Sequence, residues 1–166
     1  MSLLFPLLIG LFTTRTGASL ALRHGITRVR PWASWPGAAG VAMTAALIPA
    51  SVTHFKQPQR SGLVAIVPGW VPMPSQVVTA TGLLELLLAT SLVFPRTRQR
   101  GAIGTIVLLI AIFPANVVAA HGVDHASAPD TPLLRRTLLQ LAFITTCLLA
   151  TANSGPATTP DENRAR

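Results

Sequence analysis

The sequence predicts an all-α protein, a polytopic bundle of membrane helices, and composition and periodicity both support this fold class. Half of the residues are hydrophobic and only 11% are charged, whereas a soluble domain carries about a quarter charged residues. Apolar runs of about 20 residues recur along the chain, and this is the length a helix needs to cross a bilayer. No alternating pattern typical of strands competes with them.

The N-terminal run, residues 2–22, is the weakest of these segments because Arg15 interrupts it. It lacks the early basic region and the cleavage pattern of a signal peptide. Two interpretations remain: a membrane helix, or an interfacial helix in which Arg15 reaches toward lipid headgroups. We expect residues 1–35 to form an N-terminal helix followed by a basic linker, in which Trp32 and Trp35 suit the membrane–water interface.

Residues 36–152 contain four further apolar runs and form the expected transmembrane helical bundle. In order, the runs are GAAGVAMTAALIPASVTHF, VVTATGLLELLLATSLVF, GAIGTIVLLIAIFPANVVAA and LLRRTLLQLAFITTCLLATA. Pro49 and Pro114 each remove one backbone donor, so we expect both helices to kink. Residues 153–166 are polar and contain prolines, and we expect a disordered tail.

The net charge of +8 is spread in short groups between the apolar runs rather than gathered in one patch. This layout is typical of cytoplasmic loops and argues against nucleic-acid binding. If the group Arg96, Arg98 and Arg100 is cytoplasmic, nine basic residues lie inside and four outside, and the C-terminus is cytoplasmic. The N-terminus is then outside with five spans and inside with four.

Four polar residues fall within or at the ends of different apolar runs: His54, Glu85, Asn116 and Gln140. Glu85 is the only acid in a span, where an ionised carboxylate is costly. By helix rise, all four lie in the outer half of the bundle. One hypothesis is a polar pocket that binds a small molecule or a proton. The other is that these side chains hold the helices together by interhelical hydrogen bonds.

Other candidate sites are weak. His121, Asp124 and His125 have a spacing that could suit a metal, but a solvated loop is the better interpretation, and no metal is expected. The single cysteine, Cys147, permits no intrachain disulfide and should pack as a small apolar residue. No phosphate loop, haem-attachment motif or nucleophile elbow is present. We therefore assign no catalytic residue and expect no activity from this chain alone.

Several segments in order resemble the DoxX-like family of small bacterial membrane proteins: THF at a helix end, IVPGWVPMP, TGLLELLLA, LVFPRTRQRGA and LLIAIFPANVVAA. The resemblance implies a four-helix core with an N-terminal extra helix, in a bacterial inner (plasma) membrane. It places His54, Glu85 and Asn116 at the family's polar positions. It also makes residues 60–75 a short amphipathic segment, either a lid near His54 or a plain connector.

The resemblance leaves two functional hypotheses. Some related proteins are subunits of quinone-linked oxidoreductases, others look like assembly factors, and most have no assigned activity. The leading expectation is an accessory subunit, scaffold or small-molecule-binding partner of a membrane complex. The alternative is a quinone-binding subunit of a membrane oxidoreductase. The expected partners are the lipid bilayer and a membrane redox or assembly protein.

Overall fold

The computed structural model describes residues 4–129 and 131–152, and this part of the chain contains helices and no strand. The helices, in chain order, are α1 (Leu4–Arg23), the 3₁₀ turn η1 (Thr27–Val29), α2 (Arg30–Ala33), α3 (Trp35–Thr53), α4 (Gln59–Ala65), α5 (Pro74–Val93), α6 (Arg98–His121) and α7 (Leu133–Thr151). The expected tail, with Asp161 and Glu162, lies outside the described residues.

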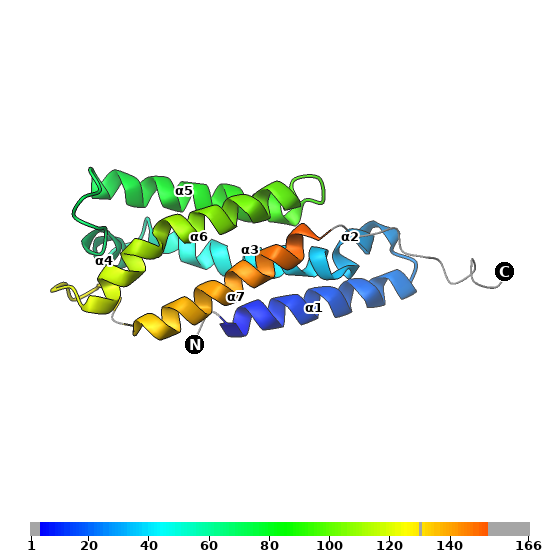
Figure 1. Ribbon diagram of the computed structural model, residues 1–166. Coiled ribbons are helices and arrows are strands. Elements are labelled where there is room, and N and C mark those ends of the chain that lie inside the picture. The colour runs from blue at the N-terminus through cyan, green and yellow to red at the C-terminus, as the bar shows by residue number, and fades with distance from the viewer. Residues whose placement is uncertain (1–3, 130, 153–166) are drawn as a thin grey trace.

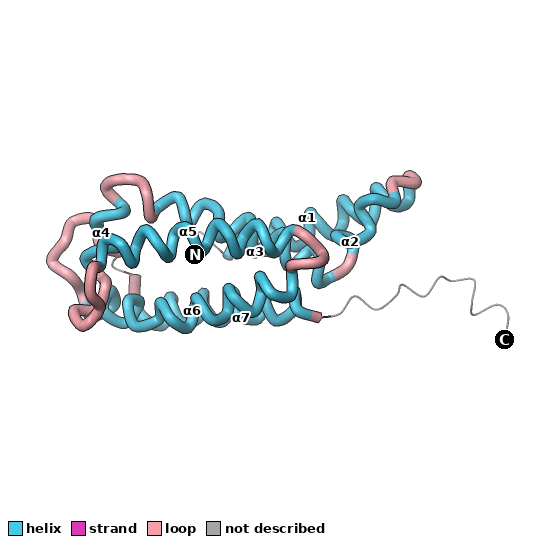
Figure 2. The backbone as a smooth tube through the Cα atoms, turned by 90° about the horizontal axis from the view of Figure 1, so that it is seen from above, coloured by secondary structure: helices cyan, strands magenta, loops and turns pink. Residues whose placement is uncertain are grey.

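Four helices, α3, α5, α6 and α7, form the bundle core (Figures 1 and 2). Contacts run from α3 to α5, from α5 to α6, from α6 to α7 and from α7 back to α3, so the four close into a ring. Each is long and apolar enough to cross a membrane, which indicates a membrane protein. The prediction of an all-helical chain with four membrane-length helices is therefore confirmed.

Small side chains on α3 explain how its neighbours approach so closely. Ala38, Ala39, Ala42 and Ala46 are fully buried. A Cβ atom at Gly40 would lie 2.5 Å from the carbonyl oxygen of Leu92 on α5. Because lipid is as apolar as the side chains, close backbone packing of this kind is a main source of stability between membrane helices.

Helix α1 lies along the outside of α3 and is not among the described helices apolar enough to span (Figure 1). Its Leu7 joins the hydrophobic core of the bundle. Arg15 lies 4.0 Å from the ring centroid of Trp35 and donates to the Ala33 carbonyl at 3.3 Å. Arg15 is therefore held against the protein by a cation–π contact and a backbone carbonyl.

The basic group at the start of α6 is not uniformly exposed. Arg96 and Arg100 are exposed, but Arg98 is only 5% exposed. Its Nε donates to the Leu92 carbonyl at 3.4 Å, and its Nη2 has no hydrogen-bond partner among the described residues. Arg98 packs beside Gly40, so it joins the turn to α3 as well as contributing charge.

Candidate functional site

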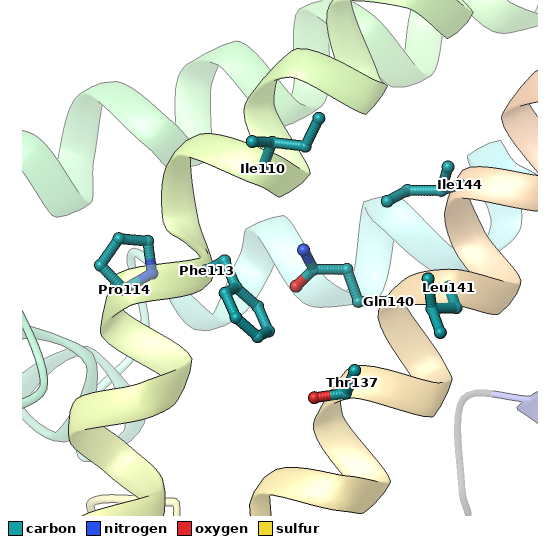
Figure 3. A pocket seen from close by; sticks show the side chains of 7 residues that line it. All are labelled: Ile110, Phe113, Pro114, Thr137, Gln140, Leu141 and Ile144. Atoms are coloured by element: carbon teal, nitrogen blue, oxygen red, sulfur yellow. The ribbon is translucent and has the colours of Figure 1, made fainter.

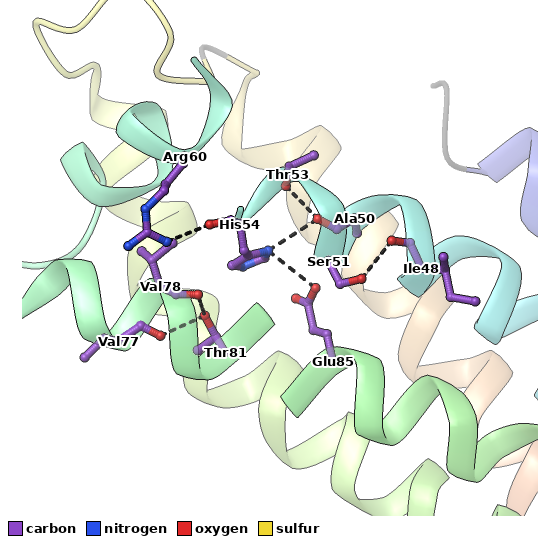
Figure 4. A network of polar contacts seen from close by, with 10 residues as sticks. All are labelled: Ile48, Ala50, Ser51, Thr53, His54, Arg60, Val77, Val78, Thr81 and Glu85. Carbon is purple, nitrogen blue, oxygen red and sulfur yellow. Dashed lines mark hydrogen bonds and ion pairs between the residues drawn. The ribbon is translucent and has the colours of Figure 1, made fainter. Parts of the chain in front are cut away.

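The end of α3 meets the middle of α5, and this offset creates the candidate site (Figure 4). His54 directly follows α3, and its Cβ lies 2.6 Å from the position a Cβ at Gly82 would take. Helix α5 begins at Pro74, so Gly82, which contacts His54, is its ninth residue. The eight residues before Gly82 therefore extend about 12 Å beyond the end of α3. His54 therefore lies at the depth of Glu85.

His54 and Glu85 face each other across the α3–α5 contact. The His54 Nδ1 atom is 3.7 Å from Glu85 Oε2, and the two side chains are 13% and 7% exposed. The same Nδ1 lies 3.3 Å from the Ala50 carbonyl oxygen. Oε2 is buried and has no hydrogen bond to any described residue, so the carboxyl group presents an unused oxygen inside the bundle.

Gly82 makes this pairing sterically possible. It lies one turn before Glu85 on the same face of α5. A Cβ there would also lie 2.9 Å from His54 Cγ and 3.0 Å from Phe55 Cε2. The imidazole ring thus occupies the space that any side chain at residue 82 would fill.

Arg60, on α4, bonds to residues at the end of α3 and at the start of α5. Its Nη1 donates to the His54 carbonyl at 2.7 Å, and its Nη2 donates to the Ser75 carbonyl and hydroxyl at 3.0 and 2.8 Å. Helix α4 is therefore tied to the end of α3, as Figure 4 shows, and also to the start of α5. Sequence reasoning placed α4 near His54 but gave Arg60 no part in the site.

The segment after α4 follows the expected amphipathic pattern. Ile66 is buried, Leu63 and Val67 are half-buried, and Trp70 is 76% exposed. Such a residue suits the headgroup region of a bilayer. The segment thus packs its apolar side on the bundle and leaves the indole outside.

Burial governs the electrostatics of the His54 side chain. It lowers the pKa of His54 below the ordinary value, hydrogen bonds to backbone oxygens of Ala50 and Ser51 oppose the shift, and the positive charge of Arg60 adds to it. A neutral imidazole has one nitrogen that donates and one that accepts. Because Nδ1 faces the Ala50 carbonyl oxygen, which can only accept, Nδ1 is the donor of the neutral ring and Nε2 is the nitrogen that can accept.

The other two predicted polar residues form a second pair, between α6 and α7. Asn116 Nδ2 donates to Gln140 Oε1 at 3.2 Å, and Gln140 Nε2 donates to the Leu109 carbonyl at 3.0 Å. Arg136 Nη1 donates to Asn116 Oδ1 at 3.2 Å. Within residues 4–129 and 131–152, no hydrogen bond or ion pair joins this pair to His54 or Glu85. Asn116 and Gln140 act as interhelical links, as the second hypothesis proposed.

The histidines of the α6–α7 connection make local contacts. His121 Nδ1 lies 2.8 Å from the Val117 carbonyl, and His125 Nδ1 accepts from the backbone N–H of Ser127 at 3.2 Å. In the described part of the chain, no three histidine, cysteine or acidic side chains group in a way that could hold a metal ion. Cys147 is fully buried in the core, which confirms its packing role.

The sequence was compared with those of known proteins. No curated protein and no solved structure matches the chain. A family model described as a domain of unknown function, DUF8561, matches residues 43–151. This range contains both polar pairs, all of α5, α6 and α7, and α3 from Met43 onward, while α1 and α2 precede it. The chain belongs to the DUF8561 family.

Proposed function

We propose that this protein is an accessory integral membrane protein of the DoxX-like type, which binds a small polar molecule at His54 and Glu85. The observation that supports this proposal is the unpartnered, buried Oε2 atom of Glu85. Nearly all buried polar atoms in native proteins have a hydrogen-bond partner, and leaving one without costs about 1–3 kcal/mol. A bound molecule that hydrogen-bonds to Glu85 would remove this cost.

The contrast between the two polar pairs strengthens the argument. In the α6–α7 pair, one amide bonds to the other and Gln140 also bonds to the backbone of α6, which is what a purely structural link requires. Glu85 has only a 3.7 Å approach to His54, a distance beyond an ordinary hydrogen bond. The pair therefore has unused hydrogen-bonding capacity, and a neutral ligand with a carbonyl, hydroxyl or N–H group matches it.

The setting of the site also suits an accessory role in a bacterial plasma membrane. The sequence offers no catalytic motif, and its resemblance to the DoxX-like family implies a four-helix core that accompanies other membrane proteins. The arginine-rich groups favour a cytoplasmic C-terminus. In this orientation, His54, Arg60 and α4 lie toward the outer face.

A quinone-binding subunit is the second candidate, favoured by the contact of two titratable groups inside an apolar bundle. A quinone carbonyl could accept a hydrogen bond from a protonated Glu85. Because the sequence has no CxxC or haem-attachment motif, the electrons would come from a partner protein.

Native mass spectrometry of protein gently extracted from its own membrane tests the proposal. The comparison includes wild type, Glu85→Gln and, as a matched control, Asp124→Asn, which neutralises an exposed loop acid. We expect a small molecule on wild type and Asp124→Asn that Glu85→Gln loses, and the mass of a quinone would support the second candidate. A protein partner retained by all three forms, with no small ligand on any, would contradict the site.

A further inference from the structure

The groove between α6 and α7 is walled mainly by apolar side chains, including Ile110, Phe113 and Leu141 (Figure 3). The amide of Gln140, which also lines it, is already bonded to Asn116. Among the described residues, no charged side chain lines the groove, so it has no means of selecting a lipid by its headgroup. A charged side chain with unused hydrogen-bond donors lies instead at the end of the bundle where α6 begins.

Arg98, the first residue of α6, is enclosed between helices and only 5% exposed. It packs beside Gly40 of α3, where an added Cβ would lie 3.2 Å from Arg98 Cδ and Nε. Its Nε donates to the Leu92 carbonyl at 3.4 Å, which is long for a hydrogen bond. Nη2 is enclosed and has no partner among the described residues. Nη1 makes no hydrogen bond to a described residue either, but it is not enclosed, so the guanidinium group can be reached at this nitrogen.

The positive charge of Arg98 has no counter-charge in the described part of the chain. A guanidinium group stays charged and only donates hydrogen bonds, so its missing partner is an acceptor. The acids among the described residues are Glu85, which lies beside His54, and Asp124, which follows the far end of α6. A buried charge without a partner is costly, and an anion bound at Arg98 would remove this cost.

The surroundings of Arg98 have the composition of a membrane–water boundary. In Figure 1, the α5–α6 turn, α2 and the C-terminal ends of α1 and α7 lie at the same end of the bundle. Trp32 Nε1 donates to the Val93 carbonyl at 3.0 Å, which holds α2 beside the end of α5, and tryptophan is typical of the headgroup region. Helix α6 starts without a side-chain cap and without an acid in its first turn, so its N-terminus adds partial positive charge. The exposed arginines at this end are Arg23, Arg28, Arg30, Arg96 and Arg100.

We infer that Arg98 binds the phosphate group of a phospholipid whose acyl chains lie along the bundle. A phosphate group supplies the missing negative charge, and a guanidinium group can donate to two of its oxygens at once. Phospholipids carry their phosphates at the headgroup level, where the arginines and Trp32 of this end also lie. Free inorganic phosphate offers the same acceptor oxygens without acyl chains, so the test separates the two sources. This site is distinct from the His54–Glu85 pair and does not depend on the ligand proposed there.

Photocrosslinking of the full-length protein in maltoside micelles tests this assignment, because such micelles contain no competing phosphate. The probe is phosphatidylglycerol with a diazirine on one acyl chain, and the matched probe is the diacylglycerol with the same chains, which lacks the phosphate. The mole fraction of probe that gives half-maximal crosslinking around the α5–α6 turn is measured by mass spectrometry. We expect this mole fraction to be about tenfold or more lower for phosphatidylglycerol, the effect of charge-assisted hydrogen bonds. Inorganic phosphate that replaces chloride at equal ionic strength should leave it unchanged.

Two variants test the role of the Arg98 side chain. Arg98→Gln should raise the half-maximal mole fraction of phosphatidylglycerol about tenfold or more, to that of the diacylglycerol. Arg100→Gln is the control: it removes the same charge from an exposed position at the start of α6 and should raise the value at most about fivefold.

Circular dichroism shows whether each variant keeps its helices, and the comparison of the two probes on wild type keeps the inference testable if Arg98→Gln does not fold. Equal values for the two probes, or for wild type and folded Arg98→Gln, would overturn the assignment. Displacement of phosphatidylglycerol by inorganic phosphate would overturn a lipid as the source of the phosphate group.

Discussion

Replacing Gly82 with alanine would test the contact that brings His54 beside Glu85. The added Cβ would lie 2.6 Å from His54 Cβ and 2.9 Å from His54 Cγ. Real Cβ atoms do not approach other heavy atoms this closely, so the end of α3 must move away from α5. His54 would then withdraw from Glu85.

The expected magnitude comes from two opposing effects. Overpacking a well-packed position costs about 1–3 kcal/mol, while replacing glycine by alanine inside a helix stabilises it by about 0.5–1 kcal/mol. The overpacking cost is at the upper end here, because the atoms that clash belong to the base of the His54 side chain and cannot rotate away. We therefore expect Gly82→Ala to lower the free energy of unfolding by about 1–2 kcal/mol.

Reversible unfolding in mixed micelles, driven by increasing SDS and followed by circular dichroism, provides the measurement. Gly104→Ala is the matched control: its Cβ would lie 2.6 Å from Leu88 Cδ2, the flexible end of a side chain, and 3.8 Å from the next atom. We expect that control to unfold within about 0.5 kcal/mol of wild type or later, because Leu88 can rotate. Equal stability of Gly82→Ala and Gly104→Ala would refute the packing described for His54.

Three further predictions concern other contacts. Arg60→Met should lower the free energy of unfolding by about 1–2 kcal/mol because three hydrogen bonds to the end of α3 and the start of α5 are lost. Lys56→Met, which changes an exposed residue, is the control and should not lower it. Equal effects of the two substitutions in thermal unfolding would contradict the role of α4. Asn116→Ala and Gln140→Ala should show a coupling energy of about 1 kcal/mol in a double-mutant cycle, and additive effects would disprove the α6–α7 link. Gly17→Ala, whose Cβ meets nothing within 4 Å, should stabilise the protein by about 0.5–1 kcal/mol, and a lower melting temperature would contradict the open position described on α1.

The sequence was sufficient to predict the helices because their signals are local. Length and hydropathy place the four core helices within a few residues of where the structure has them. Glu85 and Gln140 stood out for the same reason, since a polar side chain in an apolar run is visible without knowing the fold. Cys147 was placed in the core by the same reasoning.

The pairing of these residues could not be predicted, because it depends on which face each helix presents and on how far the helices are offset. His54 marks the end of α3 in the sequence, yet the offset between α3 and α5 brings it beside Glu85. Asn116 lies within hydrogen-bonding distance of Gln140 and Arg136 rather than of the first pair. Only the three-dimensional structure shows which polar side chains contact each other.

Two other features depended on tertiary contacts, and the first had no sequence signal of its own. Arg98 lies in a basic group like Arg96 and Arg100, but Gly40 on α3 gives it room to be buried. Gly82 did carry a signal, since it lies one turn before a buried acid. A glycine at that spacing indicates that another group approaches the helix beside the carboxylate.

Infrared spectroscopy of the Glu85 carboxyl group tests the central claim most directly. Glu85 is the only acidic residue in an apolar run, so subtracting the spectrum of Glu85→Gln from that of wild type isolates its band. The account predicts that this band shifts when gently extracted protein is stripped of bound small molecules and returns when the extract is added back. A band that stays the same in both preparations would contradict a ligand at Glu85.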